Sequence, residues 1–302
     1  MTKNEHYSVM LKETIESLRI KPNGTYIDLT MGMGGHSLAI LEQLNEEGKL
    51  ICFDKDKFAL QNTEQRLKET KKAYKLINSD FCNLKKELEK INVFKVDGII
   101  ADLGMSSPQI DNAERGFSYS QDAKLDMRMD QSQELSAYEV VNNYDESKLI
   151  QIFKNYADVK LAHQVAKAIV KHRPIRTTLE LVSIIKNAYP AAILRQKNPA
   201  KAIFQAIRIE VNHEYDSLQS MLEQSIELLN PFSSISIITF HSGEDKIVKN
   251  FFGTLIKSKI PKNIPIIEEK SFIAKSILPS KNEIEINNRS RSAKLRILTK
   301  IK

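Results

Sequence analysis

Apolar and polar positions follow two different periods along the first hundred residues. Short apolar runs alternate there with segments in which apolar residues recur at helical spacing. The runs and the helical segments between them are 26–30, 36–44, 50–53, 57–70, 75–77, 83–91 and 97–103. Short buried runs separated by helices are typical of parallel strands with helices packed on both faces. The pattern predicts an α/β protein with a doubly wound, mostly parallel, Rossmann-like sheet.

The pattern changes after residue 103. Residues 104–134 show neither period, and a stretch of this length in a compact protein is usually functional or disordered. Helical segments without strands follow. Ser136 with Glu139, and Thr177 with Glu180, have the spacing of a capping box. These two pairs therefore predict two helix starts.

A single long helical pattern from 200 to 229 then leads back to an apolar strand at 234–240. We therefore predict an all-helical domain, 108–212, that is inserted between the fourth and fifth strands. The sheet domain is formed by 1–107 and 213–302.

The end of the chain is less regular. Ser242 and Asp245 predict the start of a helix that extends to about Ile256. Residues 257–293 give no clear pattern, and the apolar alternation of "AKLRILTKI" predicts a final strand.

Composition excludes several classes of protein. The chain has 302 residues and only two cysteines, Cys52 and Cys82, without a C-x-x-C pair. This excludes a disulfide scaffold and a cysteine-based zinc site, so no metal is expected. No apolar run approaches the ~20 residues of a membrane span, and the N-terminus lacks a signal-peptide core. We expect a soluble cytoplasmic protein that has no membrane partner.

The positive charge is concentrated near the C-terminus. The chain carries a formal net charge of +7. Residues 241–302 hold 14 Lys+Arg against 6 Asp+Glu, whereas the first 240 residues hold 31 against 32. A basic segment of this kind favours a polyanionic partner such as RNA. A solvated lysine-rich tail explains the charge equally well.

A glycine-rich loop follows the first predicted strand in "TYIDLTMGMGGHS". Gly32, Gly34 and Gly35 allow a positive φ and a close approach of the backbone to a ligand. The helix that starts at His36 would direct its N-terminal amides to that ligand. The spacing is G-x-G-G, which differs from the dinucleotide fingerprint G-x-G-x-x-G. On its own the loop could serve only as a turn.

Ligand-type residues also follow the other predicted strands, where open α/β sheets bind their ligands. Asp54 lies twenty residues after Gly34 and could accept hydrogen bonds from both hydroxyls of a ribose. Asp80 could accept from an adenine amine, and Phe81 could stack on the ring. Asp102 ends the fourth strand, where the reactive end of a cofactor would lie. Any one of these acids could instead cap a helix, Asp80 especially.

Both NAD and S-adenosylmethionine would suit such a site. The missing third glycine and the absence of a second strand-bearing domain argue against a dinucleotide. We therefore expect S-adenosyl-L-methionine, the methyl donor.

Seven segments then carry a specific resemblance. They are "YIDLTMGMGGHS", "DLGMSSPQID", "ERGFSY", "LDMRMD", "FQAIRIEVN", "FHSGED" and "NNRSRSAKLR". Together they resemble the bacterial methyltransferases that modify the N4 amine of a cytosine in 16S ribosomal RNA. The resemblance extends from about His6 to the C-terminus. It implies a class I methyltransferase sheet with an inserted helical domain that helps to recognise RNA in the small ribosomal subunit.

The resemblance also implies a set of donor-binding residues. They are Gly34, Gly35, His36, Asp54, Phe81, Asp102 and Gln109. His36 is expected to bind the donor through its backbone. Asp102 is the catalytic candidate, because an acceptor near the methyl group could orient the cytosine amine and receive its proton. Alternatively, Asp102 only orients the amino acid part of the donor.

Six further residues are candidates for contacts with the RNA: Arg115, Arg128, His241, Ser242, Arg289 and Arg291. The four arginines could bind phosphates, although Arg128 could instead pair with Asp126 or Asp130. His241 and Ser242 could face the target base or cap the following helix.

Two departures from the family pattern motivate an alternative function. The family usually reads "FHSLED" where this chain has "FHSGED", and "YGEE" where this chain has "YADV". The alternative is an RNA-binding ribosome-assembly factor of the same fold that has weak or lost turnover. A nicotinamide oxidoreductase is a third hypothesis. The sequence leaves a homodimer open.

Overall fold

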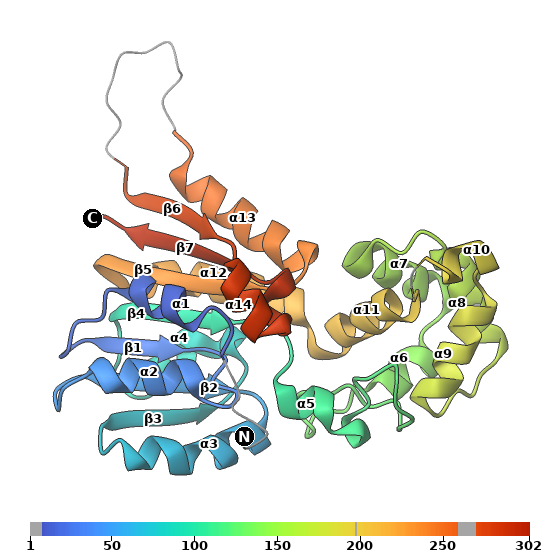
Figure 1. Ribbon diagram of the computed structural model, residues 1–302, viewed down its shortest axis with the longest axis horizontal. Helices are drawn as coiled ribbons and strands as arrows, with labels where there is room; N and C mark the ends of the chain where they lie inside the picture. The colour runs from blue at the N-terminus through green and yellow to red at the C-terminus, as the bar shows by residue number, and fades with distance from the viewer. Residues whose placement is uncertain (1–7, 197, 259–269) are drawn as a thin grey trace. The chain divides into compact units, whose positions relative to one another are not determined.

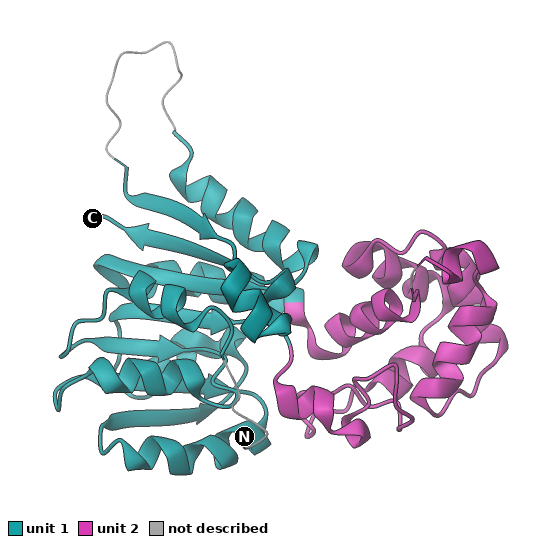
Figure 2. Cartoon of the chain, viewed as in Figure 1, with its two compact units in different colours: residues 1–104, 215–302 teal, residues 105–214 magenta. Residues whose placement is uncertain are grey.

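The computed structural model describes residues 8–196, 198–258 and 270–302, and it divides the chain into two compact units. The sheet unit comprises Met1–Gly104 and Tyr215–Lys302, and the helical unit comprises Met105–Glu214 (Figure 2). The bounds expected from the sequence lie within a few residues of these.

A seven-stranded sheet forms the centre of the sheet unit, in the order β3-β2-β1-β4-β5-β7-β6 (Figure 1). The strands are β1 Thr25–Asp28, β2 Lys49–Asp54, β3 Ala73–Asn78, β4 Val96–Asp102, β5 Leu229–Thr239, β6 Phe272–Ile277 and β7 Lys294–Lys300. The first five are parallel, and β7 and β6 are added antiparallel at one edge. The parallel strands therefore bring their carboxyl ends to one edge of the sheet.

Helices cover both faces of this sheet. Alternate strand residues point to opposite faces, and on β1 Tyr26 joins one apolar cluster whereas Ile27 joins the other. The first cluster includes α1 (Leu11–Leu18), α2 (Gly35–Gln43) and α3 (Lys57–Glu69). The second includes α4 (Leu84–Glu89), α12 (Glu214–Leu228) and α13 (Ser242–Ile256). The predicted doubly wound α/β fold is confirmed.

The part of the chain without a clear sequence pattern contributes one strand and two short helices. They are β6, α14 (Lys281–Ile286) and the 3-10 turn η3 (Asn288–Ser292). β6 and β7 form an antiparallel pair, and β7 joins it to β5. The final strand predicted from "AKLRILTKI" is confirmed. Residues 259–269 lie outside the described part of the chain.

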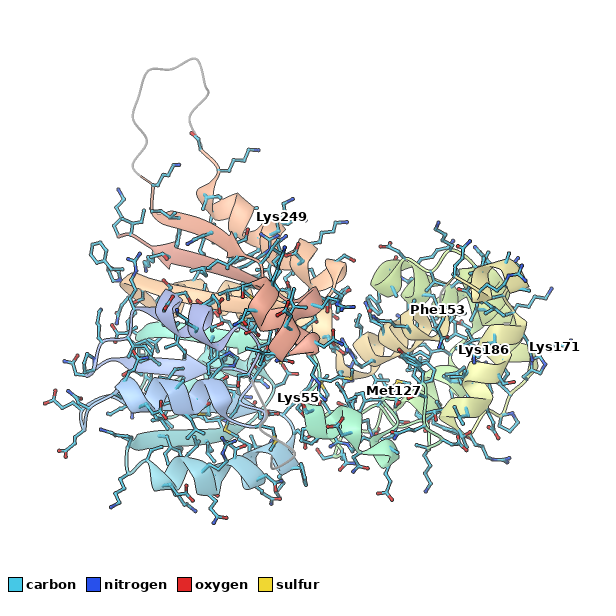
Figure 3. All side chains as sticks on the ribbon, viewed as in Figure 1. Lys55, Met127, Phe153, Lys171, Lys186 and Lys249 are labelled. Carbon is cyan, nitrogen blue, oxygen red and sulfur yellow. The ribbon has the colours of Figure 1, made fainter. Side chains whose placement is uncertain are left out.

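The helical unit has an apolar core of its own. Its elements are α5 Ser107–Asp111, η2 Ala113–Arg115, α6 Ala137–Asn143, α7 Glu146–Ala157, α8 Ala162–Lys171, α9 Thr178–Asn187, α10 Ala191–Leu194 and α11 Ala200–Asn212. Met127 and Phe153 are fully buried in this core (Figure 3). Within the described residues the unit has no named strand, only one isolated bridge between Lys124 and Thr177.

The helix predicted over 200–229 is in fact two helices. α11 ends at Asn212, and His213 adopts the left-handed conformation with φ 50°. The Asn212 side chain accepts from Met129 N–H at 2.8 Å and donates to the Met127 carbonyl at 2.8 Å. These bonds tie the end of α11 to the irregular segment, and the left-handed residue then redirects the chain.

The two predicted capping boxes have different outcomes. Thr177 caps α9, and the Glu180 carboxylate accepts in return from Thr177 N–H at 3.1 Å. Ser136 is the N-cap residue of α6, so the predicted helix start is confirmed, but its side chain makes no cap bond and the capping box itself is not formed. The first amides of α6 instead donate to carbonyl oxygens of the irregular segment, at Asp126 and Leu125. Tertiary contacts have replaced the local cap.

We therefore expect Thr177→Ala and Ser136→Ala to differ in their effect on stability. Loss of a working N-cap costs about 1 kcal/mol, whereas Ser136→Ala removes no cap bond and should change stability by less than about 0.5 kcal/mol. The measurement is urea unfolding of the full-length chain, followed by circular dichroism. Equal losses in the two variants would contradict this assignment of the caps.

Candidate functional site

The loop after β1 depends on glycine. Gly32 and Gly34 have φ values of +49° and +76°, in the left-handed region that favours glycine. A Cβ on Gly34 would collide with Thr63 of α3. The Thr63 hydroxyl donates to the Gly32 carbonyl at 2.8 Å, and Arg66 donates to the Met33 carbonyl at 2.6 Å. The loop is therefore held from α3 in one defined shape.

Helix α2 begins directly after this loop, without a side-chain cap. Its N-cap residue is Gly34, and its first turn contains no acidic residue. The first amides of a helix need acceptors that the helix itself cannot supply. Together with the positive end of the helix dipole, they form a site suited to a carboxylate or phosphate.

His36 lies buried in the first turn of α2. Its Nε2 is 3.2 Å from the Val9 carbonyl oxygen, and burial lowers its pKa to about 4. The ring is therefore neutral at pH 7. His36 Nδ1 is 3.9 Å from Asp102 Oδ2, which is too long for a hydrogen bond. The side chain fixes the start of α2, which leaves its backbone for the predicted role in donor binding.

Asp54 ends β2 and is tied to the glycine loop. Its Oδ2 accepts from Gly32 N–H and its Oδ1 accepts from Asp56 N–H, both at 2.8 Å. Burial raises the pKa of Asp54 to about 6 despite these two bonds. Each carboxylate oxygen can accept a further hydrogen bond, so the predicted contact with a ribose remains compatible with the structure.

Asp80 has a structural task, and its adenine contact stays a prediction. Its Oδ1 accepts from Cys82 N–H at 2.8 Å, and its Oδ2 is 3.2 Å from Lys55 Nζ. It caps the 3-10 turn η1 (Phe81–Asn83), as the alternative reading proposed. Phe81 starts that turn and is only partly buried. It therefore keeps surface that could stack on a ring.

Asp102 ends β4 with an unsatisfied oxygen. Its backbone N–H donates to Thr30 Oγ1 at 2.6 Å, but its Oδ1 is buried and has no hydrogen-bond partner among the described residues. Burial raises the pKa of Asp102 well above its usual range, and the nearby Asp28 and Glu244 carboxylates raise it further. An orphaned buried acceptor is costly to the protein, and it is the feature expected where a ligand supplies the donor.

Asp28 is a site residue that the sequence analysis missed. It ends β1, where it accepts from Ser37 Oγ at 2.6 Å and from Thr30 N–H at 3.1 Å. Burial raises its pKa to about 6. An acid inside the apolar run "YIDL" was the available signal. Together, the neighbouring strands β1, β2 and β4 each end in an aspartate whose pKa is raised.

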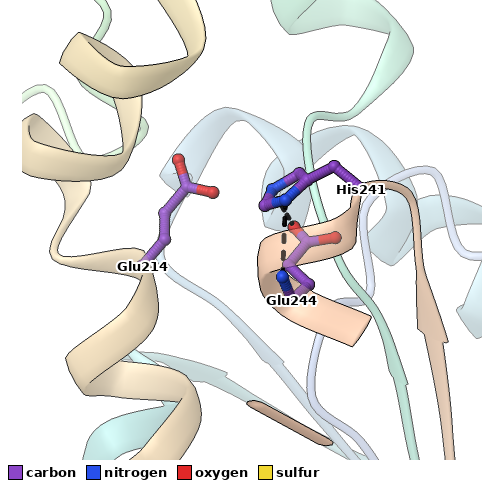
Figure 4. A group of neighbouring side chains, drawn as sticks. All are labelled: Glu214, His241 and Glu244. Carbon is purple, nitrogen blue, oxygen red and sulfur yellow. Dashed lines mark hydrogen bonds and ion pairs between the residues drawn. The ribbon is translucent and has the colours of Figure 1, made fainter. Parts of the chain in front are cut away.

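His241 and Glu244 follow β5 at the same edge of the sheet (Figure 4). His241 is the N-cap of α13 and accepts from Glu244 N–H, while Glu244 Oε2 accepts from Phe240 N–H at 2.8 Å. The start predicted from Ser242 and Asp245 is thus displaced by one residue, and Ser242 is the first helical residue. The spacing H-x-x-E was the signal for this reciprocal cap.

Three predicted site residues lie in the helical unit. Gln109 Oε1 accepts from Ser106 N–H at the start of α5. Arg115 is buried, and its guanidinium donates to the carbonyls of Arg128 and Met129. Arg128 pairs with Asp126 at 2.8 Å, as its alternative reading proposed. These bonds give both arginines structural tasks, and their phosphate contacts remain predictions.

The two C-terminal arginines are arranged differently. Arg289 and Arg291 lie on η3 and are exposed, whereas Ser290 between them is fully buried. They are placed where a polyanion could reach them.

The glycine loop, the uncapped start of α2 and the carboxyl groups at the ends of β1, β2 and β4 fit S-adenosylmethionine. The amides suit its carboxylate and Asp54 suits its ribose, while the unpaired Asp102 oxygen suits a hydrogen-bond donor that a ligand brings to the end of β4. This fold and site define a class I, S-adenosylmethionine-dependent methyltransferase.

The chain belongs to the MraW methylase family, whose model matches residues 3–301. It is 60% identical to "Ribosomal RNA small subunit methyltransferase H" of Mycoplasmopsis agalactiae, over 99% of both chains. It is 50% identical to the protein of the same name from Clostridioides difficile, over 98% of this chain and 99% of that one. The predicted family and enzyme class, a ribosomal RNA methyltransferase, are confirmed, and the oxidoreductase hypothesis is wrong.

Solved structures are more distant. A putative rRNA methylase from Clostridium thermocellum has a TM-score of 0.49 and 13% identity, over 98% of this chain and 100% of that one. In the described part of the chain, no helix is long and apolar enough to cross a membrane.

The raised pKa of Asp54 predicts pH-dependent donor binding. Below about pH 6 the carboxyl group is protonated in the free protein and accepts hydrogen bonds poorly. Affinity for S-adenosylmethionine should therefore rise from about pH 5 to pH 7. Asp54→Ala should weaken binding at pH 7 by about 1–3 kcal/mol.

Calorimetry on the wild type, Asp54→Ala and Asp54→Asn would check both statements. Asp54→Asn keeps one acceptor oxygen and should retain part of the affinity. Its affinity should depend less on pH, and the pH dependence that is left is attributed to Asp28, whose pKa is also about 6. Unchanged affinity in folded Asp54→Ala would remove the ribose role.

Proposed function

We propose that this protein transfers a methyl group from S-adenosylmethionine to the exocyclic N4 amine of a cytosine in 16S ribosomal RNA of the small subunit. The observation that carries the proposal is the match to the MraW methylase family over residues 3–301, with relatives named for the small-subunit RNA. The orphaned Asp102 oxygen at the end of β4 supports methyl transfer at this edge of the sheet.

On the donor side, the backbone amides of Gly34, Gly35 and His36 would hold the carboxylate of the methionine part. Asp54 would hold the ribose, and Phe81 would lie against the adenine. Gln109 is the donor contact expected from the start of α5. When bound, the donor supplies a methyl group that its sulfonium centre has already activated.

On the acceptor side, the amine of cytosine is a poor nucleophile because its lone pair is delocalised into the ring. Ionised Asp102 would accept a hydrogen bond from the amine, which localises the lone pair and fixes its direction. As the N4–carbon bond forms and the carbon–sulfur bond breaks, the amine loses a proton, which Asp102 would receive. Alignment of the reactants supplies much of the remaining rate.

The carboxyl groups at the strand ends also favour the charged donor over its product. Burial raises the pKa of Asp28, Asp54 and Asp102 in the free protein, and the Asp28 carboxylate raises the pKa of the other two further. A sulfonium cation offsets that cost, whereas the product after methyl transfer lacks this charge. The same group of acids therefore supports both donor binding and product release.

We expect two basic segments of the chain to contact the RNA. Residues 241–302 have a surplus of eight positive charges. In the helical unit, residues 147–214 hold 12 Lys+Arg against 4 Asp+Glu, whereas residues 105–146 hold 3 against 9. Lys171 on α8 and Lys186 on α9 are exposed members of the basic half (Figure 3). Such segments suit the phosphate backbone of RNA, and a partner in the small subunit implies a cytoplasmic location.

The alternative of an assembly factor with lost turnover rests on the altered "YADV" and "FHSGED" segments, and the structure accounts for the glycine of the second. A Cβ on Gly243 would collide with the ring of Tyr215, and this ring lies 6.0 Å from that of His241. The glycine is thus accommodated by a tyrosine that fills the space. Because the bonds of Asp54 and the His241–Glu244 cap are intact, methyl transfer is the function favoured here.

The decisive experiment is mass mapping of N4-methylcytosine in 16S RNA from cells with and without this protein. Loss of the mark on deletion, and its return with purified protein and donor, is expected. An unchanged mark, together with normal binding to subunits, would favour the assembly factor.

Asp102→Ala should abolish methylation while the fold survives. The variant removes the acceptor next to the reacting amine, and it also relieves the burial of an unpaired carboxyl group, so stability should not fall. Single-turnover transfer and thermal unfolding are measured on the same sample. Near-normal transfer would remove Asp102 from the catalytic role.

Replacement of both Arg289 and Arg291 by Ala should weaken binding to ribosomal RNA. Phosphate contacts release counterions, so the slope of log affinity against log salt should flatten by up to ~1–2. Donor affinity should hardly change.

The matched control is Lys68→Ala with Lys75→Ala, which removes two exposed charges from α3 and β3. A changed thermal midpoint or donor affinity with an unchanged salt slope would show that the arginine pair has a packing role instead.

A further inference from the structure

A short N-terminal segment, Ser8–Met10, lies against the donor loop. A Cβ on Gly35 would collide with Ser8, so Ser8 rests directly on this glycine. The Val9 carbonyl oxygen is 3.2 Å from His36 Nε2. Val9 and Met10 are buried in an apolar cluster with Ile238 of β5 and with Leu295 and Ile297 of β7. This segment therefore supports the two residues that start α2.

Glu283 on α14 fixes the end of that segment. Its Oε1 accepts from Met10 N–H at 3.0 Å, across 273 residues of sequence. The same oxygen accepts from Ser290 Oγ at 2.5 Å, and Ser290 is fully buried in η3. Glu283 is itself held in place, because its backbone N–H donates to the Ser280 hydroxyl at 3.1 Å. One carboxylate oxygen thus joins the N-terminal segment to η3.

We propose that Glu283 is a positioning residue for donor binding, which acts through Met10 and Val9 on His36 and the start of α2. Among the described residues, none of its hydrogen bonds is to the loop or to a residue assigned to the donor. The carboxylate fixes Met10, and the fixed segment presents the Val9 carbonyl to the His36 ring. Without it, the His36 side chain loses its fixed acceptor, and the amides at the start of α2 lose their alignment.

The inference rests on the donor site proposed above, and three variants test it. Glu283→Ala removes the acceptor for both bonds, whereas Glu283→Gln keeps an amide oxygen that can accept from Met10 N–H and Ser290 Oγ. Glu285→Ala is the matched control, because Glu285 lies on the same short helix and is exposed. All three are made in the full-length chain.

The readouts are the dissociation constant for S-adenosylmethionine by calorimetry, the KM for the donor, kcat at saturating donor and the thermal midpoint. Glu283→Ala should raise the dissociation constant and the KM about three- to tenfold, and it should leave kcat nearly unchanged. Glu283→Gln and Glu285→Ala should resemble the wild type. A purely structural role would lower the thermal midpoint without this selective change in KM.

A double-mutant cycle with His36→Ala tests the route. If Glu283 acts through the Val9–His36 contact, Glu283→Ala should add little once His36→Ala has removed that contact. Full additivity of the two losses would overturn the route. Unchanged donor affinity in Glu283→Ala, or failure of Glu283→Gln to restore it, would overturn the role itself.

The proposed function and the role of Glu283 would be contradicted by different results. A wild-type protein that does not bind S-adenosylmethionine would contradict the proposed function. A wild type that binds the donor, beside a Glu283→Ala variant that binds it equally well, would contradict only the role of Glu283. If Glu283→Ala does not fold, Ser290→Ala is used instead, because it removes only the bond between Ser290 and Glu283. The loss of donor affinity in Ser290→Ala should then be smaller than the loss in His36→Ala.

Discussion

The candidate site depends on carboxyl groups that are wholly or partly removed from solvent where parallel strands end. Asp28 and Asp54 are both satisfied by donors of the protein, through Thr30 N–H and Ser37 Oγ for one and through Gly32 N–H and Asp56 N–H for the other. These bonds shape the turns after β1 and β2. Asp102 Oδ1 lacks such a donor among the described residues. Two acids therefore build the loop, and the third is left with an acceptor for the ligand.

This arrangement reduces the stability of the free protein at neutral pH. The pKa values of Asp28 and Asp54 are near 6 in the folded chain, against about 3.9 for an exposed aspartate. Between these values the folded state binds more protons than the unfolded state, so stability falls as pH rises from about 4 to about 6. A bound cation opposes that loss. Sites that bind charged ligands commonly retain strain of this kind in the free state.

The sequence was sufficient for the fold, and for placing the glycine loop and the acids after the strands, because these depend on local pattern. The apolar run 50–53 and the glycines of the loop reflect requirements of the backbone, and both can be recognised in the sequence itself. The break at His213 could not be foreseen, since it depends on Asn212 bonding to Met127 and Met129, more than 80 residues away. The absent cap at Ser136 has a similar cause, because carbonyls from the irregular segment supply the acceptors. The role proposed for Glu283 could not be predicted either, because its partner Met10 is 273 residues away in the sequence.

Exposed and buried side chains alternate within three residues of one 3-10 turn near the C-terminus. Arg289 and Arg291 are exposed, while Ser290 is buried and donates to Glu283. A 3-10 helix has about three residues per turn, so consecutive side chains lie on different sides of its axis. The arginines can therefore face a polyanion while the serine anchors the turn. If phosphates hold the arginines, they also restrain Ser290 and, through Glu283, the segment that supports His36. Substrate and donor would then stabilise the same set of contacts, and linkage requires each to favour the binding of the other.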